Sequence, residues 1–101
     1  MTNLVSLYLH SNLLTDLPEQ MSLLTNLTQI NLADCKLTKF PKVLLHMPSL
    51  EFITLSSNKI QVIPPEIGRL TNLEKLDLGQ TLVKVIPTDL IHLKFLNTIK
   101  L

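Results

Sequence analysis

The chain has 101 residues and a mass of 11.4 kDa, which is enough for one domain and too little for a multidomain assembly. Nine Lys and Arg residues against eight Asp and Glu residues give a net charge of +1, so charge offers no reason to expect binding to nucleic acid. Apolar residues make up 46% of the chain, which supports a folded core, and two glycines leave little room for a phosphate-binding loop.

The sequence predicts neither a membrane span nor a signal peptide. No apolar run approaches the roughly 18 residues of a membrane span, and the first residues show no basic segment followed by an apolar one. The single cysteine, Cys35, cannot form an internal disulfide, which favours a reducing compartment. We therefore expect a cytoplasmic location, and we interpret the glycosylation sequon Asn26-Leu27-Thr28 as accidental.

The dominant feature of the sequence is a repeat of 23 residues without insertions. Each unit is numbered from its leading leucine, and positions 1, 4, 6, 11, 14, 18 and 21 are apolar in every complete unit. Such a pattern predicts units that stack and share one core. The predicted organisation of the domain 1–101 is a partial unit 1–3, complete units 4–26, 27–49, 50–72 and 73–95, and a partial unit 96–101.

Within each unit the elements follow in a constant order. Positions 3 to 7 alternate outward and apolar residues, which predicts a short strand with one buried face. Position 9 is Asn12, Cys35, Asn58 or Thr81, and we expect its side chain to bond backbone groups buried by the following turn. Proline at position 15 ends the extended segment, and one or two turns of 3₁₀ or α-helix are predicted at 19–24, 42–47, 65–70 and 88–93.

The unit L-x-x-L-x-L-x-x-(N/C/T)-x-L-x-x-(L/I/F)-P resembles the leucine-rich repeat family over essentially the whole chain. Its length and the proline make it most similar to the intracellular repeats of Ras-pathway scaffolds, polarity scaffolds and Roco-type proteins. The resemblance implies an α/β solenoid with a curved parallel sheet on the concave face. It also implies that this face binds a protein partner.

Alternation places one set of strand side chains on the solvent side of this sheet. Two of the four aromatic residues, Tyr8 and Phe52, belong to that set, and aromatic side chains are favoured anchors at interfaces. The alternative is that Tyr8 only shields an open N-terminal edge of the sheet and that Phe52 only covers the aliphatic parts of its neighbours. The predicted partner-binding residues are Ser6, Tyr8, His10, Gln29, Asn31, Phe52, Thr54, Lys75, Asp77 and Lys100.

An enzymatic role is not supported by the motifs. His10, Ser11 and Asp34 fall at the same end of neighbouring strands, yet no nucleophile elbow or oxyanion loop accompanies them. His46 and His92 share position 20 two units apart, roughly 10 Å by the spacing of strands, which is too far for one metal ion. We therefore expect no catalysis, cofactor or metal. Lys36, Lys39 and Lys42, with Lys59 nearby, form a basic stripe, for which the alternatives are a solvated flank, an acidic partner or a phosphoinositide.

Three functional hypotheses remain open at this stage. The first is a non-enzymatic interaction module in intracellular signalling or scaffolding. The second is a structural fragment of a longer array, and the third is a targeting segment of a larger kinase or GTPase. Neither end carries a polar cap, so we also expect self-association through the uncapped ends of the solenoid.

Overall fold

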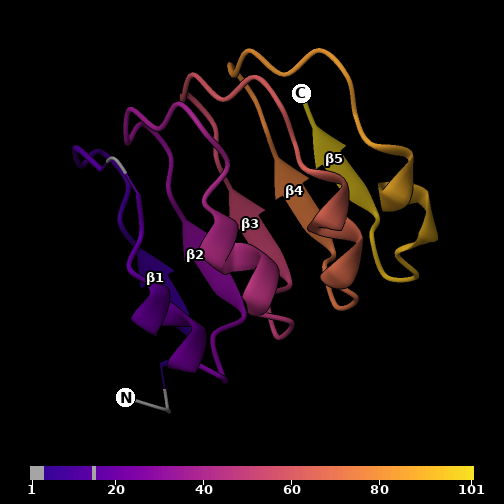
Figure 1. The fold of residues 1–101 in the computed structure, drawn as a ribbon, viewed down its shortest axis with the longest axis horizontal. Coiled ribbons are helices and arrows are strands. Elements are labelled where there is room, and N and C mark those ends of the chain that lie inside the picture. Colours follow the sequence, from indigo (N-terminus) through magenta and orange to yellow (C-terminus); the bar gives the residue numbers. More distant parts are fainter. Residues whose placement is uncertain (1–3, 15) are drawn as a thin grey trace.

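The computed structural model describes residues 4–14 and 16–101, and the partial unit predicted at 1–3 lies outside these described residues. Strands and five-residue 3₁₀ helices (η) alternate along the chain (Figure 1). The elements are β1 (Ser6–Tyr8), η1 (Glu19–Leu23), β2 (Gln29–Asn31), η2 (Lys42–His46), β3 (Phe52–Thr54), η3 (Pro65–Arg69), β4 (Lys75–Asp77), η4 (Thr88–His92) and β5 (Thr98–Lys100). Each strand and each helix thus recurs after 23 residues.

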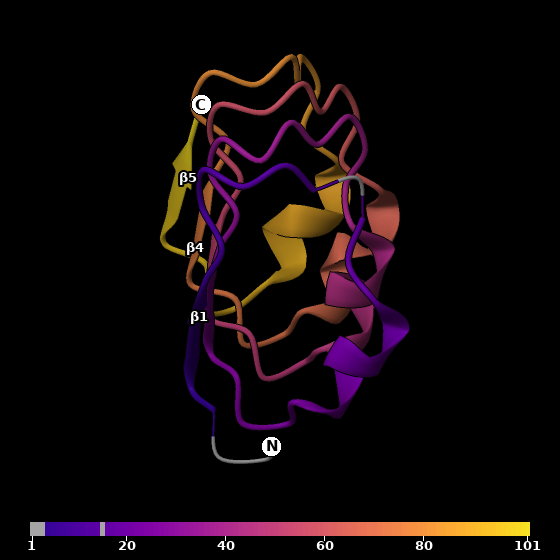
Figure 2. The same ribbon diagram turned by 90° about the vertical axis from the view of Figure 1, so that its left-hand side faces the viewer.

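The five strands form one parallel sheet in the order β1-β2-β3-β4-β5. Register partners such as Leu7 and Ile30 occupy the same position in successive units. Viewed along the stack, the sheet forms one side of a flattened coil and the 3₁₀ helices form the opposite, convex side (Figure 2). The predicted leucine-rich repeat solenoid, with its parallel sheet and short convex helices, is confirmed.

The strands are shorter than the five-residue alternation that the sequence predicts. Each ends at position 5, although the position-6 amide of Leu9 still donates to the carbonyl of Asn31 at 2.8 Å. Two residues later the chain turns through a left-handed conformation, with φ between 53° and 61° at Ser11, Asp34, Ser57 and Gln80. A positive φ cannot continue a strand, so this recurrent position-8 turn limits the strand length.

The core lies between the sheet and the 3₁₀ helices and is continuous through the units. All seven apolar positions are buried in both central units, 27–49 and 50–72. In the fourth unit Leu76 and Leu78 are buried, whereas Val83 and Ile86 are only half-buried. The reason is that residues 96–101 cover the strand side of this unit and not its loop side. Burying one such aliphatic side chain contributes about 1.5–3 kcal/mol.

The prolines at position 15 precede the convex helices as predicted. Pro18, Pro41, Pro64 and Pro87 each cap the N-terminus of one helix in an extended conformation, with φ between −60° and −69°. Each helix ends after five residues, where the C-cap amide bonds the carbonyl three residues earlier, as Leu70 does to Ile67. These one-to-two-turn helices confirm the prediction of short convex segments.

Asn58 joins two units through its buried carboxamide. Its Nδ2 donates to the carbonyls of Leu32 at 2.9 Å and Leu55 at 3.0 Å. Its Oδ1 accepts the backbone N–H groups of Cys35 and Leu37, both at 3.0 Å. Three of these four partners belong to the preceding unit, so the side chain couples units 27–49 and 50–72 as well as satisfying its own turn.

The other position-9 residues perform this task less completely. The buried Cys35 thiol donates to the carbonyl of Leu9 at 3.0 Å, which is one bond to the preceding unit. Thr81 donates to the carbonyl of Leu78 at 2.8 Å and accepts the Val83 amide at 3.4 Å, both within its own unit. Position 9 bonds backbone groups of the turn in each complete unit, and at Asn58 these groups are buried as predicted. The coupling to the preceding unit weakens from Asn58 to Cys35 to Thr81.

We expect Asn58→Ala to be strongly destabilising. The substitution leaves two N–H groups and two carbonyls in the buried turn without the Asn58 carboxamide as their partner. The free energy of unfolding should fall by about 3 kcal/mol, and the melting temperature by about 15 °C. Urea and thermal unfolding followed by circular dichroism measure both quantities.

Asn12→Ala is the matched control. The Asn12 amide donates to the carbonyls of Leu9 and His10 at an exposed position, where water can replace it. Its loss should cost about 0.5 kcal/mol. Equal effects of the two substitutions would contradict a special coupling role for Asn58.

Candidate functional site

The solvent side of the sheet presents two rows of side chains that cross all five strands. The strand register places position-3 residues next to one another and position-5 residues next to one another. The first row is Ser6, Gln29, Phe52, Lys75 and Thr98, and the second is Tyr8, Asn31, Thr54, Asp77 and Lys100. Neighbours within a row are separated by about 4.8 Å, the distance between strands. Nine of the ten predicted site residues lie in these two rows, and Thr98 is the one row member that the prediction leaves out.

The tenth predicted residue, His10, lies just beyond β1, where the chain enters its turn. It is exposed, and its counterparts at position 7 in later units are the small residues Ala33, Ser56 and Gly79. A Cβ atom on Gly79 would lie 3.2 Å from Oδ1 of Asp77, so the absence of a side chain there leaves room for that carboxylate. At the C-terminal ends of the strands, the concave face therefore has only small residues after β2, β3 and β4, whereas the His10 imidazole follows β1.

Side chains in the second row are oriented by the backbone. Asn31 Oδ1 accepts the amide of Ala33, and Asp77 Oδ1 accepts the amide of Gly79, each at 3.0 Å. Because one oxygen of each side chain is held in this way, the remaining polar atoms point in a restricted direction. Pre-oriented polar groups of this kind lose less conformational entropy when a partner binds.

Two aromatic side chains stand out on this polar face. Tyr8 is 56% exposed and Phe52 is 36% exposed. Two strand spacings, roughly 10 Å, separate their strands, and the half-buried Gln29 and Asn31 on β2 lie between them. The opposite end of the sheet carries the charges of Lys75, Asp77 and Lys100. The face thus combines an aromatic half on β1 to β3 with a charged half on β4 and β5.

The structure shows the surroundings of the groups that were considered for catalysis or metal binding. Cys35 is buried and its thiol bonds a backbone carbonyl. His10, Ser11 and Asp34 are exposed, and no hydrogen bond joins their side chains in the part of the chain that the structure describes. Over residues 4–14 and 16–101, no group of three or more His, Cys, Asp or Glu residues could hold a metal ion.

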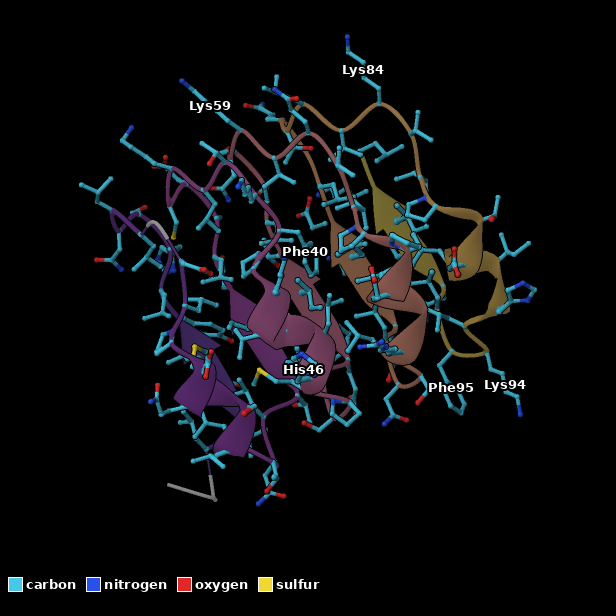
Figure 3. The ribbon with its side chains drawn as sticks, in the orientation of Figure 1. Phe40, His46, Lys59, Lys84, Lys94 and Phe95 are labelled. Atoms are coloured by element: carbon cyan, nitrogen blue, oxygen red, sulfur yellow. The ribbon has the colours of Figure 1, made fainter. Side chains whose placement is uncertain are left out.

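Sequence analysis missed one exposed aromatic residue. Phe95 is 58% exposed in the connection between η4 and β5, beside Lys94 and away from the concave rows (Figure 3). It occupies position 23 of its unit, which is Ser49 and Asn72 in the two central units, so no apolar column marks this position. Phe40, by contrast, is only 6% exposed and belongs to the core.

The sequence model of the family described as "Leucine rich repeat" matches residues 2–60, and the model described as "Leucine Rich repeats (2 copies)" matches residues 48–91. The chain belongs to the leucine-rich repeat family. No curated protein matches this leucine-rich repeat chain. Among residues 4–14 and 16–101, no helix has both the length and the apolar character that crossing a membrane requires.

Solved leucine-rich repeat structures are similar over nearly the whole chain. A leucine-rich repeat protein of Leptospira interrogans has 33% identity and a TM-score of 0.89 over 99% of this chain and 26% of its own. The Arabidopsis receptor kinase HAESA, solved in complex with the peptide hormone IDA and a co-receptor, has 30% identity and a TM-score of 0.84. This chain is covered to 99% and HAESA to 18%. The chain therefore spans about a quarter or less of these relatives.

Proposed function

We propose that this leucine-rich repeat chain is a non-enzymatic interaction module that binds a protein or peptide partner across the concave face of its sheet. One observation carries the proposal: Tyr8 and Phe52 are exposed on a polar face where alternation alone requires no aromatic residue. Large rigid aromatic side chains supply contact area at low entropic cost, which makes them effective anchors. We further propose a role in intracellular signalling or scaffolding.

The distribution of polar groups supports a protein or peptide as the partner. Asn31 and Asp77 present oriented acceptors, and Lys75 and Lys100 add donors at the charged half. A surface with aromatic anchors beside a polar rim resembles the anatomy of protein interfaces. Two related plant receptors were solved with peptide hormones, which adds support for a peptide-sized occupant here.

Replacing both aromatic anchors should abolish this binding without unfolding the protein. A phage-displayed random peptide library panned on the wild-type chain supplies the probes. For peptides selected in this way, Tyr8→Ser with Phe52→Ser should weaken binding at least tenfold, as measured by fluorescence anisotropy. The melting temperature should change little because both side chains are exposed.

Phe95→Ser is the matched control, because Phe95 is equally aromatic and exposed but lies off the concave face. It should leave the affinity of these peptides within about twofold of wild type. Selected peptides whose affinity survives the Tyr8 and Phe52 substitutions, or drops equally with Phe95→Ser, would contradict the concave site.

We also propose that the 101-residue chain self-associates through the ends of its solenoid. Ile99 on β5 and Leu101 after it occupy the positions that face the core in earlier units. Here, however, Ile99 is 38% exposed and Leu101 is 73% exposed. The outer edge of β5 presents unpaired backbone groups beside these apolar side chains. Pairing of two chains end to end would cover the unpaired backbone groups and the apolar side chains together.

Sedimentation velocity over a wide concentration range tests this association. The average sedimentation coefficient should rise with concentration, and Ile99→Lys should reduce the rise by placing a charge in the contact. Val62→Lys, at an exposed position in a central unit, should not. A single monomeric species over the whole range would overturn the proposal.

A cytoplasmic location is proposed from the free, buried thiol of Cys35. The sequon asparagine, Asn26, is exposed and is therefore accessible to glycosylation in a secretory pathway. We expect the native protein to fractionate with cytosolic markers and to show no glycan by intact mass. A glycan on Asn26 would overturn the proposed location.

A further inference from the structure

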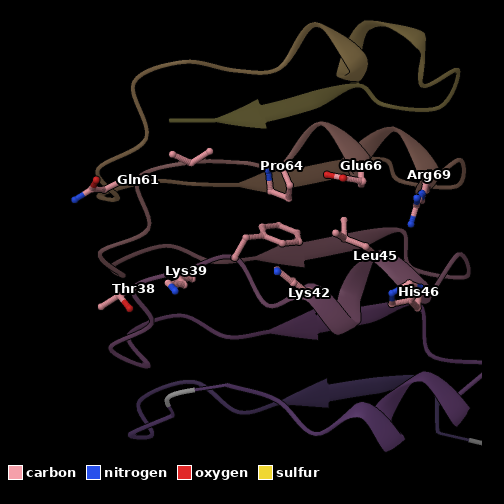
Figure 4. A pocket seen from close by; sticks show the side chains of 11 residues that line it. Thr38, Lys39, Lys42, Leu45, His46, Gln61, Pro64, Glu66 and Arg69 are labelled. Carbon is pink, nitrogen blue, oxygen red and sulfur yellow. The ribbon is translucent and has the colours of Figure 1, made fainter.

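A groove of about 600 Å³ lies on the convex side between η2 and η3 (Figure 4). Phe40 and Leu45, both buried, supply its inner apolar surface. Val62, which is 69% exposed, and the half-buried Pro64 supply an apolar wall from the next unit. A cavity of this size and apolar lining is comparable to sites that hold drug-sized ligands or a few side chains of a peptide.

The rim of this groove is positively charged. Lys39, Lys42 and Arg69 line it together with one carboxylate, Glu66. Three of the nine basic residues of the chain therefore meet one of its eight acidic residues here, a local charge of +2 in a chain whose total is +1. Figure 4 shows Lys39 at one end of the groove, Arg69 with His46 at the other, and Lys42 between them.

Two grooves that flank it along the row of 3₁₀ helices have a net negative charge. The groove of about 500 Å³ beside η1 and η2 carries Asp16 and Glu19 against Lys42. The groove of about 380 Å³ beside η3 and η4 carries Glu66 and Asp89 against Arg69. An anionic ligand would thus be disfavoured in these two grooves. A third groove, of about 570 Å³, adjoins at Gln61 and Val62 and holds one cation, Lys84, and no carboxylate. With three cations against one carboxylate, the groove between η2 and η3 still attracts an anion most strongly among the grooves that the described residues form.

We propose that the groove between η2 and η3 is a second binding site, which takes an acidic peptide segment with an apolar side chain at its centre. The apolar lining would hold that side chain, and the spaced cations would hold carboxylates before and after it. Lys39 and Arg69 lie at opposite ends of the groove rather than converging on one point. This spacing fits carboxylates distributed along a peptide better than a single phosphate group. The site lies opposite the concave face, so it does not depend on the function proposed for Tyr8 and Phe52.

The probe is a labelled synthetic hexapeptide with a central Leu-Phe pair flanked by two acidic residues on each side. Fluorescence anisotropy should show saturable binding that weakens as salt is added. Lys42→Glu with Arg69→Glu should weaken it at least tenfold, because two attractions become repulsions. Val62→Ser should weaken it several-fold by removing apolar contact area. All three side chains are exposed, so these variants should keep the wild-type melting temperature.

Lys59→Glu with Lys94→Glu is the matched control, because it changes the net charge equally at exposed positions outside the groove (Figure 3). It should leave the affinity within about twofold of wild type, and so should Phe52→Ser. An equal loss in this control would show diffuse electrostatic attraction and overturn the site. A peptide flanked by lysines that binds equally well, or no saturable binding at millimolar peptide, would overturn it as well.

Vesicles containing phosphatidylinositol bisphosphate provide the competing class of ligand. The proposal expects the hexapeptide to bind whether or not such vesicles do. If the vesicles bind and lose affinity with Lys42→Glu and Arg69→Glu, while the hexapeptide fails to bind, the groove is a headgroup site and the peptide proposal is wrong.

Discussion

The structure depends on the stacking of one apolar face against the next at a constant offset of 23 residues. No unit could fold alone, since its seven apolar side chains would lie against water on both sides. Ile53 is 1% exposed because Ile30 and Leu76 flank it in the sheet, and the same relation holds along every apolar column of the central units. Parallel pairing of the strands follows from this offset, because equivalent residues must lie side by side.

Stacking also decides which residues are free to evolve a function. Strand positions that face the core are restricted to aliphatic side chains, whereas the outward positions hold side chains as different as those of Phe52, Thr54 and Lys75. On the convex side, η2 and η3 contact each other less extensively than η3 and η4 do. The groove lies between η2 and η3, where Phe40 of one unit and Val62 of the next line the same hollow. Two chemically different surfaces therefore share a single core.

The units have the same backbone conformation, but the hydrogen bonds that join each unit to the preceding one differ in number. The left-handed turn at position 8 recurs in all four complete units although no glycine occupies it. Asp34 tolerates this conformation, whereas Ser57 and Gln80 have no such preference, so stacking imposes the turn there. At position 9, Asn58 bonds the preceding unit through three groups, Cys35 through one, and Thr81 bonds only its own turn. We infer that cohesion is greatest at the centre of the chain, between units 27–49 and 50–72.

The sequence by itself determined the period, the buried columns, the proline before each convex helix and the outward rows of the sheet, because these depend on spacing along one chain. It also identified Lys39 and Lys42 as part of a basic stripe. Only the tertiary structure decided that Arg69, Val62 and Phe40 join these lysines in a groove, and that Phe95 is exposed beside β5. The physical reason is that such surfaces form between units, from residues that no periodic constraint relates to one another.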